Sequence, residues 1–329
     1  MNLIALTRVF LAGLILIVPA LGLAQQGSVY PNRPLRMLVT FPPGGSTDLI
    51  ARMISPPLGE RLGRPVIVEN RPGASGAIAA EVVAKAPPDG HVLMVAGTST
   101  VMGLNVILIP NLPYDPKDLA PITLLVRSPF IIAINTSMLP VGSIKEMVAL
   151  LKTKPQQTPY ASGGNLTGMH LAGEYFRSLA GLNMLHVPYK GNGPALSDVS
   201  GGQVPIAFVD LGSTGPFRKS DRVKILAVAD KQRAAVAPDI PTSAEAGLPG
   251  WEAIGSFGLV TTTGTPADTI QRLHAEVTRI LRLPDIRERI LVTGNEPAPM
   301  TPDEFGAFAK SEVAKWPRVI KESGIKIEQ

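Results

Sequence analysis

Residues 35–62 read LRMLVTFPPGGSTDLIARMISPPLGERL. The run 35–41 has the length and composition of a buried β-strand, and apolar side chains at helical spacing follow in 47–62. The Gly- and Ser-rich turn between them leads from a strand straight into a helix. The segment therefore predicts a βα unit, the building block of a parallel sheet covered by helices.

The same rhythm repeats along the chain. Further strands are predicted at 66–68, 92–96, 159–161, 185–187, 204–209, 223–229 and 256–261. Further helices are predicted at 76–84, 144–151, 168–179, 194–199, 211–219, 267–283, 285–292 and 302–322. Ser143 and Glu146 have capping-box spacing, and Thr265-Pro266 and Thr301-Pro302 have the pattern of a cap residue followed by a first-turn proline.

Two such series predict an α/β protein of two domains with a cleft between them. The last three helices have few strands of their own, so the economical solution returns the chain to the first sheet. We predict residues 25–126 plus 231–329 as domain 1 and residues 127–230 as domain 2, with a hinge where the chain crosses. A contiguous division into two domains is the alternative.

Composition narrows the function. The chain has 329 residues, 31 basic against 26 acidic, and 45% hydrophobic residues, which describes a globular protein with no dense basic surface for nucleic acid. It has no cysteine, and its four histidines lack metal-ligand spacing. We expect neither a metal nor a cofactor.

The N-terminus has the pattern of an export signal. Arg8 precedes the uncharged run 9–23, which is shorter than the ~20 apolar residues of a spanning helix, and small residues at 22 and 24 match a signal-peptidase site. Residues 1–24 are therefore predicted to be a cleaved signal peptide, which sends the mature chain to the periplasm. An uncleaved membrane anchor is the alternative.

Loops that follow the predicted strands are rich in Gly, Ser, Thr and Asn, and each leads into a helix. A helix N-terminus offers unpaired N–H groups and about half a positive charge, so it attracts an anion without a basic side chain. We expect residues 44–47 of domain 1 and 162–167 of domain 2 to face each other and hold one carboxylate. The predicted ligand-binding residues are Phe41, Gly44, Gly45, Ser46, Thr47, Asp48, Ser99, Ala161, Ser162, Gly164, Asn165, Thr167 and Asp210. The alternative is that such turns are only structural.

Other residues have two interpretations each. Arg71 and Lys190 are candidate ligand cations, although Arg71 also suits a role in holding its own loop. His170 is expected to cap the second Gly-rich loop, and Trp251 and Trp316 are expected to pack in the core rather than stack on a ligand. Sequence signatures of nucleotide-binding and serine-nucleophile enzymes are missing. A hydrolase with a distant Ser and His pair, and a ligand sensor for a membrane signalling partner, remain open.

Short motifs along the mature chain carry a resemblance. They include residues 41–48, 68–73, 160–162, 170–173, 186–191 and 241–247. In these runs the chain resembles the substrate-binding proteins of tripartite tricarboxylate transporters, also called the Bug receptors.

The resemblance implies a non-enzymatic periplasmic receptor with a Venus-flytrap fold of type II, which captures a small carboxylate and delivers it to membrane permease subunits. It also implies a ligand carboxylate between the loops 41–48 and 160–167. Leu166 and Met169 add apolar bulk where the family has small residues, which either shrinks the pocket or favours a ligand with an apolar part. We expect a monomer.

Overall fold

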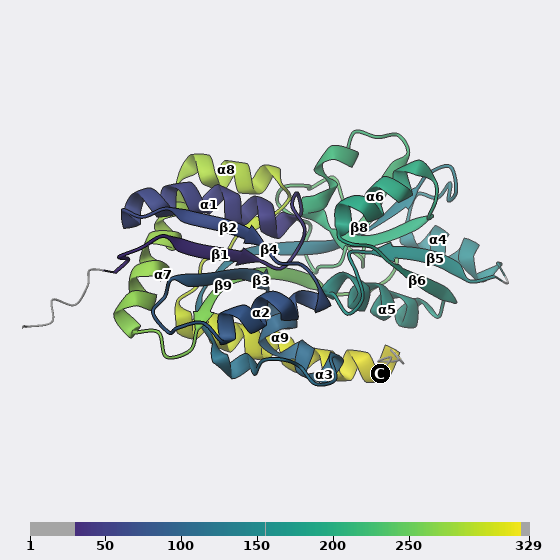
Figure 1. The fold of residues 1–329 in the computed structure, drawn as a ribbon. Coiled ribbons are helices and arrows are strands. Elements are labelled where there is room, and N and C mark those ends of the chain that lie inside the picture. The colour runs from purple at the N-terminus through teal and green to yellow at the C-terminus, as the bar shows by residue number, and fades with distance from the viewer. Residues whose placement is uncertain (1–29, 155, 324–329) are drawn as a thin grey trace, which may run out of the picture.

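The computed structural model describes residues 30–154 and 156–323. The predicted signal peptide, residues 1–24, lies outside them. The described strands form one continuous mixed sheet in the order β2-β1-β3-β9-β4-β7-β5-β6, with β8 and β10 also paired to β4 (Figure 1). Among the described residues, no helix combines the length and the apolar character needed to cross a bilayer.

We call one half of this sheet, together with its helices, the first lobe. It contains the first predicted series of strands and helices. Its strands are β1 (Leu35–Val39), β2 (Val66–Asn70), β3 (Val92–Gly97), β9 (Ile254–Thr262) and β10 (Glu296–Pro297). Its helices are α1 (Ser46–Leu62), α2 (Ala77–Ala84), α3 (Asn105–Leu108), α7 (Ala267–Arg282) and α8 (Pro284–Val292). Apolar side chains of α1, α7 and α8 pack on one face, and those of α2 pack on the other.

The other half is the second lobe. Its strands are β5 (Thr158–Ser162), β6 (Met184–Pro188), β7 (Ile206–Asp210) and β8 (Val223–Val228). Its helices are α4 (Ile144–Lys152), α5 (Gly168–Ala180) and α6 (Asn192–Gly201). Helices α4 and α5 cover one face of these strands, and α6 covers the opposite face. Both lobes are therefore helix-sheet-helix layers with separate cores.

Strand β4 (Leu119–Asn135) belongs to both lobes. Up to Pro129 it pairs with β9, and from Phe130 onward it pairs with β7 and β8. The returning chain lies beside this point, where the Ala229 amide donates to the Phe130 carbonyl at 2.8 Å. Helix α9 (Pro302–Ser323) begins on the first lobe, and its far end packs against α5 of the second (Figure 1). The division into domain 1 (25–126 plus 231–329) and domain 2 (127–230) stays a prediction.

The structure contradicts two local predictions, the parallel sheet and the cap at Thr265, and confirms a third, the start of α9. The predicted parallel sheet is mixed, because β9 runs antiparallel to β3. Thr265 does not cap α7: Pro266 itself is the cap residue, and the Thr265 hydroxyl donates back to the Thr262 carbonyl at 2.8 Å. Thr301 caps α9 as predicted, and the structure adds a reciprocal pair, in which Thr301 and Glu304 each accept from the other's backbone N–H.

Candidate functional site

Three adjoining hollows lie between the lobes, and Phe41, at the end of β1, lines all of them. The space between the atoms in them is about 530, 600 and 910 Å3, and part of it is open to solvent. We call them the chamber, the helix-start hollow and the outer hollow. Each takes residues from both lobes, so a ligand in any of them would contact both.

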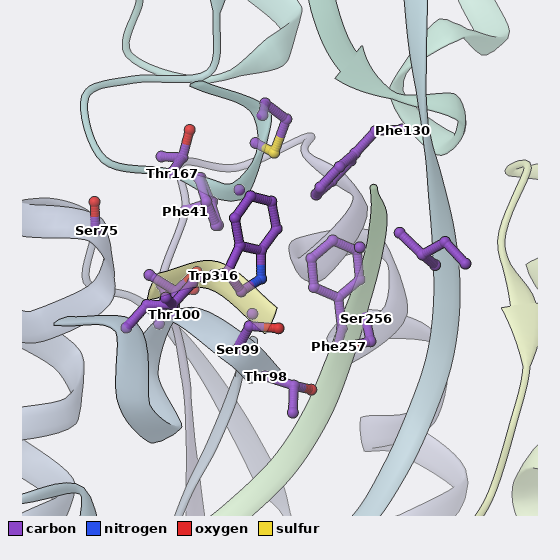
Figure 2. A pocket seen from close by; sticks show the side chains of 17 residues that line it. Phe41, Ser75, Thr98, Ser99, Thr100, Phe130, Thr167, Ser256, Phe257 and Trp316 are labelled. Carbon is purple, nitrogen blue, oxygen red and sulfur yellow. The ribbon is translucent and has the colours of Figure 1, made fainter. Parts of the chain in front are cut away.

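The chamber is the most aromatic of the three. It is lined by Thr40, Phe41, Ser75, Gly97, Thr98, Ser99, Thr100, Leu104, Phe130, Thr167, Gly168, Met169, Ile254, Gly255, Ser256, Phe257 and Trp316. Figure 2 shows the Trp316 indole in the middle of the pocket, with Phe41, Phe130 and Phe257 around it.

The helix-start hollow lies where α1 of the first lobe meets α6 of the second. It is lined by Phe41, Pro42, Pro43, Gly44, Gly45, Ser46, Thr47, Met169, Lys190, Gly191, Asn192, Gly193, Pro194, Asp210 and Phe257. The outer hollow is lined by Thr40, Phe41, Pro42, Pro72, Gly73, Ala74, Ser75, Gly76, Gly163, Gly164, Asn165, Thr167, Tyr189, Lys190 and Gly191.

The start of α1 has no side-chain cap. Its cap residue is Gly45, at φ −78° and ψ 165°, which has no side chain to accept from the first-turn N–H groups. The Asp48 carboxylate accepts instead from Gly44 N and from Arg52 and Asn70. Burial acts to raise the pKa of Asp48, but these hydrogen bonds outweigh it and lower the pKa below its usual value. Donors of the first turn are therefore left for a ligand.

Three further features of this hollow suit an anion. Helix α6 also begins without a side-chain cap, at Gly191. Lys190, just before it, is exposed and forms no ion pair with a described residue. The Thr47 hydroxyl is buried and has no partner among the described residues. Two uncapped helix starts from opposite lobes, one ammonium group and one unpaired hydroxyl thus line the same space.

Asp210 is an acid in the same lining, but its carboxylate is already occupied. It accepts from the Ser46 hydroxyl at 2.5 Å, from the Ser213 amide at 2.8 Å and from the Asn192 side chain. Burial raises the pKa of this carboxyl, and the hydrogen bonds act against that shift. The bond from Ser46 joins α1 of the first lobe to β7 of the second, so Asp210 links the lobes across the cleft.

The start of α5 is capped by its own residues. Thr167 Oγ1 accepts from the His170 amide at 3.3 Å and donates to the Gly164 carbonyl at 2.8 Å. The Leu166 amide donates to His170 Nδ1 at 3.1 Å. His170 therefore caps this loop, as expected, and the hydroxyl of Thr167 is not free for a ligand.

Ser162 and His186 have the contact that a hydrolase would need, since Ser162 Oγ lies 2.7 Å from His186 Nε2. Burial first, and then the stacked ring of His170, lowers the pKa of His186 to about 3. Such an imidazole is a weak general base at neutral pH. Ser162 is fully buried and lines none of the three hollows. This pair is structural, and it supports no nucleophilic step.

The predicted site residues divide among these places. The helix-start hollow contains Phe41, Gly44, Gly45, Ser46, Thr47 and Asp210. The chamber or the outer hollow contains Ser99, Gly164, Asn165 and Thr167. Asp48, Ala161 and Ser162 line none of them. The loops 44–47 and 163–167 thus lie on different hollows, and α6 is the helix start that α1 meets.

Sequence reasoning missed most of the chamber. Ser256 and Phe257 lie on a strand that the pattern predicts without marking it as part of the site, Phe130 lies on β4, and Trp316 lies on the last helix. Trp251 behaves as expected: it is fully buried and donates to the Ala172 carbonyl at 2.9 Å. Of the two bulky residues noted in the second loop, Met169 lines the chamber, whereas Leu166 packs on the core of the second lobe. Among the described residues no three His, Asp or Glu side chains are grouped to hold a metal.

Comparison with known proteins agrees with this geometry. A model of the tripartite tricarboxylate transporter family receptor matches residues 50–325. The protein BugT of Bordetella pertussis is 31% identical over 317 residues, which are 96% of this chain and 97% of BugT.

Two solved structures from Rhodopseudomonas palustris have the same fold. One, determined with adipate, has a TM-score of 0.86 at 31% identity and covers 90% of this chain and 99% of its own. The other, MatC with bound malate, has a TM-score of 0.81 at 31% identity and covers 88% of this chain and 100% of its own. The two-domain α/β prediction is confirmed. The matching family model describes a transporter receptor and not an enzyme, as the sequence predicts. The chain belongs to the tripartite tricarboxylate transporter receptor family.

Proposed function

We propose that this receptor captures a small organic acid in the cleft and holds its carboxylate in the helix-start hollow. The observation that carries the proposal is the uncapped start of α1, which lies beside the uncapped start of α6 and the ammonium group of Lys190. Backbone N–H groups of these starts and the unpaired Thr47 hydroxyl would bind the acid oxygens. The carboxylates seen in the two R. palustris structures support this class of ligand.

Closure of the lobes would complete the site. The lobes are joined by the Ser46–Asp210 hydrogen bond and by Ser75 Oγ, which donates to the Asn165 carbonyl at 2.8 Å. We place the hinge at β4 near Pro129 and Phe130 and at the return near Ala229, between domain 1 (25–126 plus 231–329) and domain 2 (127–230). A ligand that contacts both lobes would favour the closed arrangement, which a permease can recognise.

The test is thermal unfolding with matched pairs of ligands. Each carboxylic acid is compared with its amide, benzoate with benzamide and adipate with adipamide, because the pair differs in charge but hardly in shape. An acid at 100 times its dissociation constant should stabilise the protein by ~2.7 kcal/mol. The amide should have no comparable effect. Equal stabilisation by acid and amide, or no effect of any acid, would refute the proposal.

We further propose that residues 1–24 direct export to the periplasm, where the mature monomer delivers its ligand to the membrane permease subunits of a tripartite transporter. The run 9–23 and the small residues at 22 and 24 support this. N-terminal sequencing of protein from a periplasmic fraction should begin at Gln25. Recovery of the intact Met1 terminus in the membrane fraction would favour an anchor instead.

A further inference from the structure

The chamber and the helix-start hollow adjoin each other. Phe41, Met169 and Phe257 line both of them. A ligand whose acid group lies at the start of α1 therefore extends over these three apolar side chains and places its other end in the chamber. The chemistry of the chamber then decides which acids fit.

Among the side chains that the structure describes, none that lines the chamber is ionisable. Its walls include the rings of Phe41, Phe130, Phe257 and Trp316 (Figure 2). The Met169 side chain also lines it. Moving a second carboxylate into such surroundings would cost the free energy of desolvating a charge with no cation to offset it. A flat apolar ring, by contrast, gains from burial and from stacking on these aromatic walls.

The chamber also contains polar groups that the protein itself leaves unused. The hydroxyls of Thr40, Thr98 and Ser256 are buried and have no hydrogen-bond partner among the described residues. Thr98 is only 1% exposed and Ser256 only 4%. A buried hydroxyl without a partner is unfavourable, and each of these can both donate and accept. They suit a neutral group, such as a ligand hydroxyl, better than a group that only accepts.

We propose that the ligand is an aromatic monocarboxylate with a neutral hydrogen-bonding group at the end remote from the acid. The acid lies at the start of α1, the ring lies between Phe41, Phe257 and Trp316, and the remote group bonds to Thr98 and Ser256. This proposal rests on the proposed function, because it takes the carboxylate site as given.

Isothermal titration with five probes separates the two proposals. We expect 4-hydroxybenzoate to bind at least tenfold more tightly than adipate or malate, and more tightly than benzoate. If adipate or malate binds more tightly than both aromatic acids, the aromatic assignment is wrong and the carboxylate receptor stands. If none of the acids binds while benzamide does, the carboxylate site itself is wrong.

Variants of the remote subsite make the test specific. Thr98→Val and Ser256→Ala should each weaken 4-hydroxybenzoate about fivefold, the equivalent of one neutral hydrogen bond. Benzoate should bind to both variants as it does to the natural protein, and Thr136→Val, an exposed threonine remote from the cleft, should change neither ligand. Equal losses for benzoate and 4-hydroxybenzoate would overturn the assignment of the remote group.

The two tryptophans give a readout that does not depend on affinity. Trp316 lines the chamber and Trp251 lies in the core of the second lobe. In Trp251→Phe the remaining emission comes from Trp316 and should change when an aromatic acid saturates the site. In Trp316→Phe the emission of Trp251 should stay constant. A ligand response that persists in Trp316→Phe and is lost in Trp251→Phe would place the ring elsewhere.

Discussion

The starts of α1 and α5 look alike in sequence and differ in what satisfies their backbone donors. At α5 the side chains of Thr167 and His170 accept from the first-turn and loop N–H groups. At α1 the cap residue is Gly45, which has no side chain to accept from the first turn, and of the described backbone N–H groups Asp48 accepts only from the loop amide of Gly44. A helix start that is capped by its own residues is a structural element, whereas an uncapped one facing a hollow is a receptor for an anion. This difference is the reason why we propose that the ligand carboxylate binds at α1.

The largest effect is expected when α1 is given the cap that it lacks. Gly45 has a backbone conformation that any residue adopts, and an added Cβ would meet nothing closer than the Pro42 carbonyl oxygen at 3.7 Å. In Gly45→Asp the new carboxylate would accept from the first-turn N–H groups and repel the ligand, at a cost of several kcal/mol. Titration should show at least about a 100-fold loss of affinity.

Gly45→Ala is the matched control, because it adds the Cβ without a carboxylate. It should bind within about threefold of the natural protein, since a methyl group neither accepts a hydrogen bond nor carries charge. Equal affinity in Gly45→Asp and the natural protein would show that the start of α1 does not hold the acid.

This prediction also shows what the sequence could reveal. The Gly-rich turn at 42–47 and the apolar periodicity of 47–62 suffice to predict a strand, a turn and a helix, because these signals are local. They cannot show whether Thr167 uses its hydroxyl on its own helix, or that α6 rather than α5 meets α1. Trp316 reaches the chamber only because α9 crosses between the lobes, a long-range contact with no local signal.

The self-capped start of α5 should be sensitive to acid. Burial lowers the pKa of His170 to about 4, and burial with the neighbouring His170 ring lowers that of His186 to about 3, against an unfolded value near 6.5. As the pH falls below 6.5 the unfolded chain therefore takes up protons that the folded chain does not. The free energy of unfolding is therefore highest above pH 6.5, and it falls progressively as the pH is lowered toward 4.

Urea unfolding at pH 7 and pH 5 measures this effect. The free energy of unfolding should fall by about 1 to 2 kcal/mol per pH unit, and His186→Asn should have a smaller slope by up to about 1 kcal/mol per unit. An unchanged slope in the variant would mean that His186 is not held neutral by the fold.

A smaller effect is expected from the bond between the lobes. Ser46→Ala removes the donor that α1 offers to Asp210, and a hydrogen bond to a charged group contributes ~1.5–3 kcal/mol. Because this bond exists only when the lobes meet, affinity should fall roughly tenfold. Ser213→Ala removes another bond to Asp210, at 3.0 Å, within the second lobe alone. Titration should show that Ser213→Ala binds the ligand with nearly natural affinity. A similar loss of affinity in Ser46→Ala and Ser213→Ala would contradict a role of the Ser46–Asp210 bond in closure.

The smallest effect concerns Thr167. Thr167→Ala deletes the cap of α5 and should lower the free energy of unfolding by about 1 kcal/mol. Affinity should stay within about twofold, because its hydroxyl already bonds to Gly164 and His170. Ser143→Ala, which deletes the cap of α4 away from the cleft, should cause a similar loss of stability. A much weaker affinity in Thr167→Ala, but not in Ser143→Ala, would show that the ligand binds at the start of α5.

A crystal structure of the complex with 4-hydroxybenzoate would be the most direct measurement. The acid oxygens should lie within ~3 Å of first-turn N–H groups of α1, such as those of Ser46 and Thr47. The ring should lie beside Trp316. A carboxylate bound at residues 163–167, away from α1, would contradict the assignment.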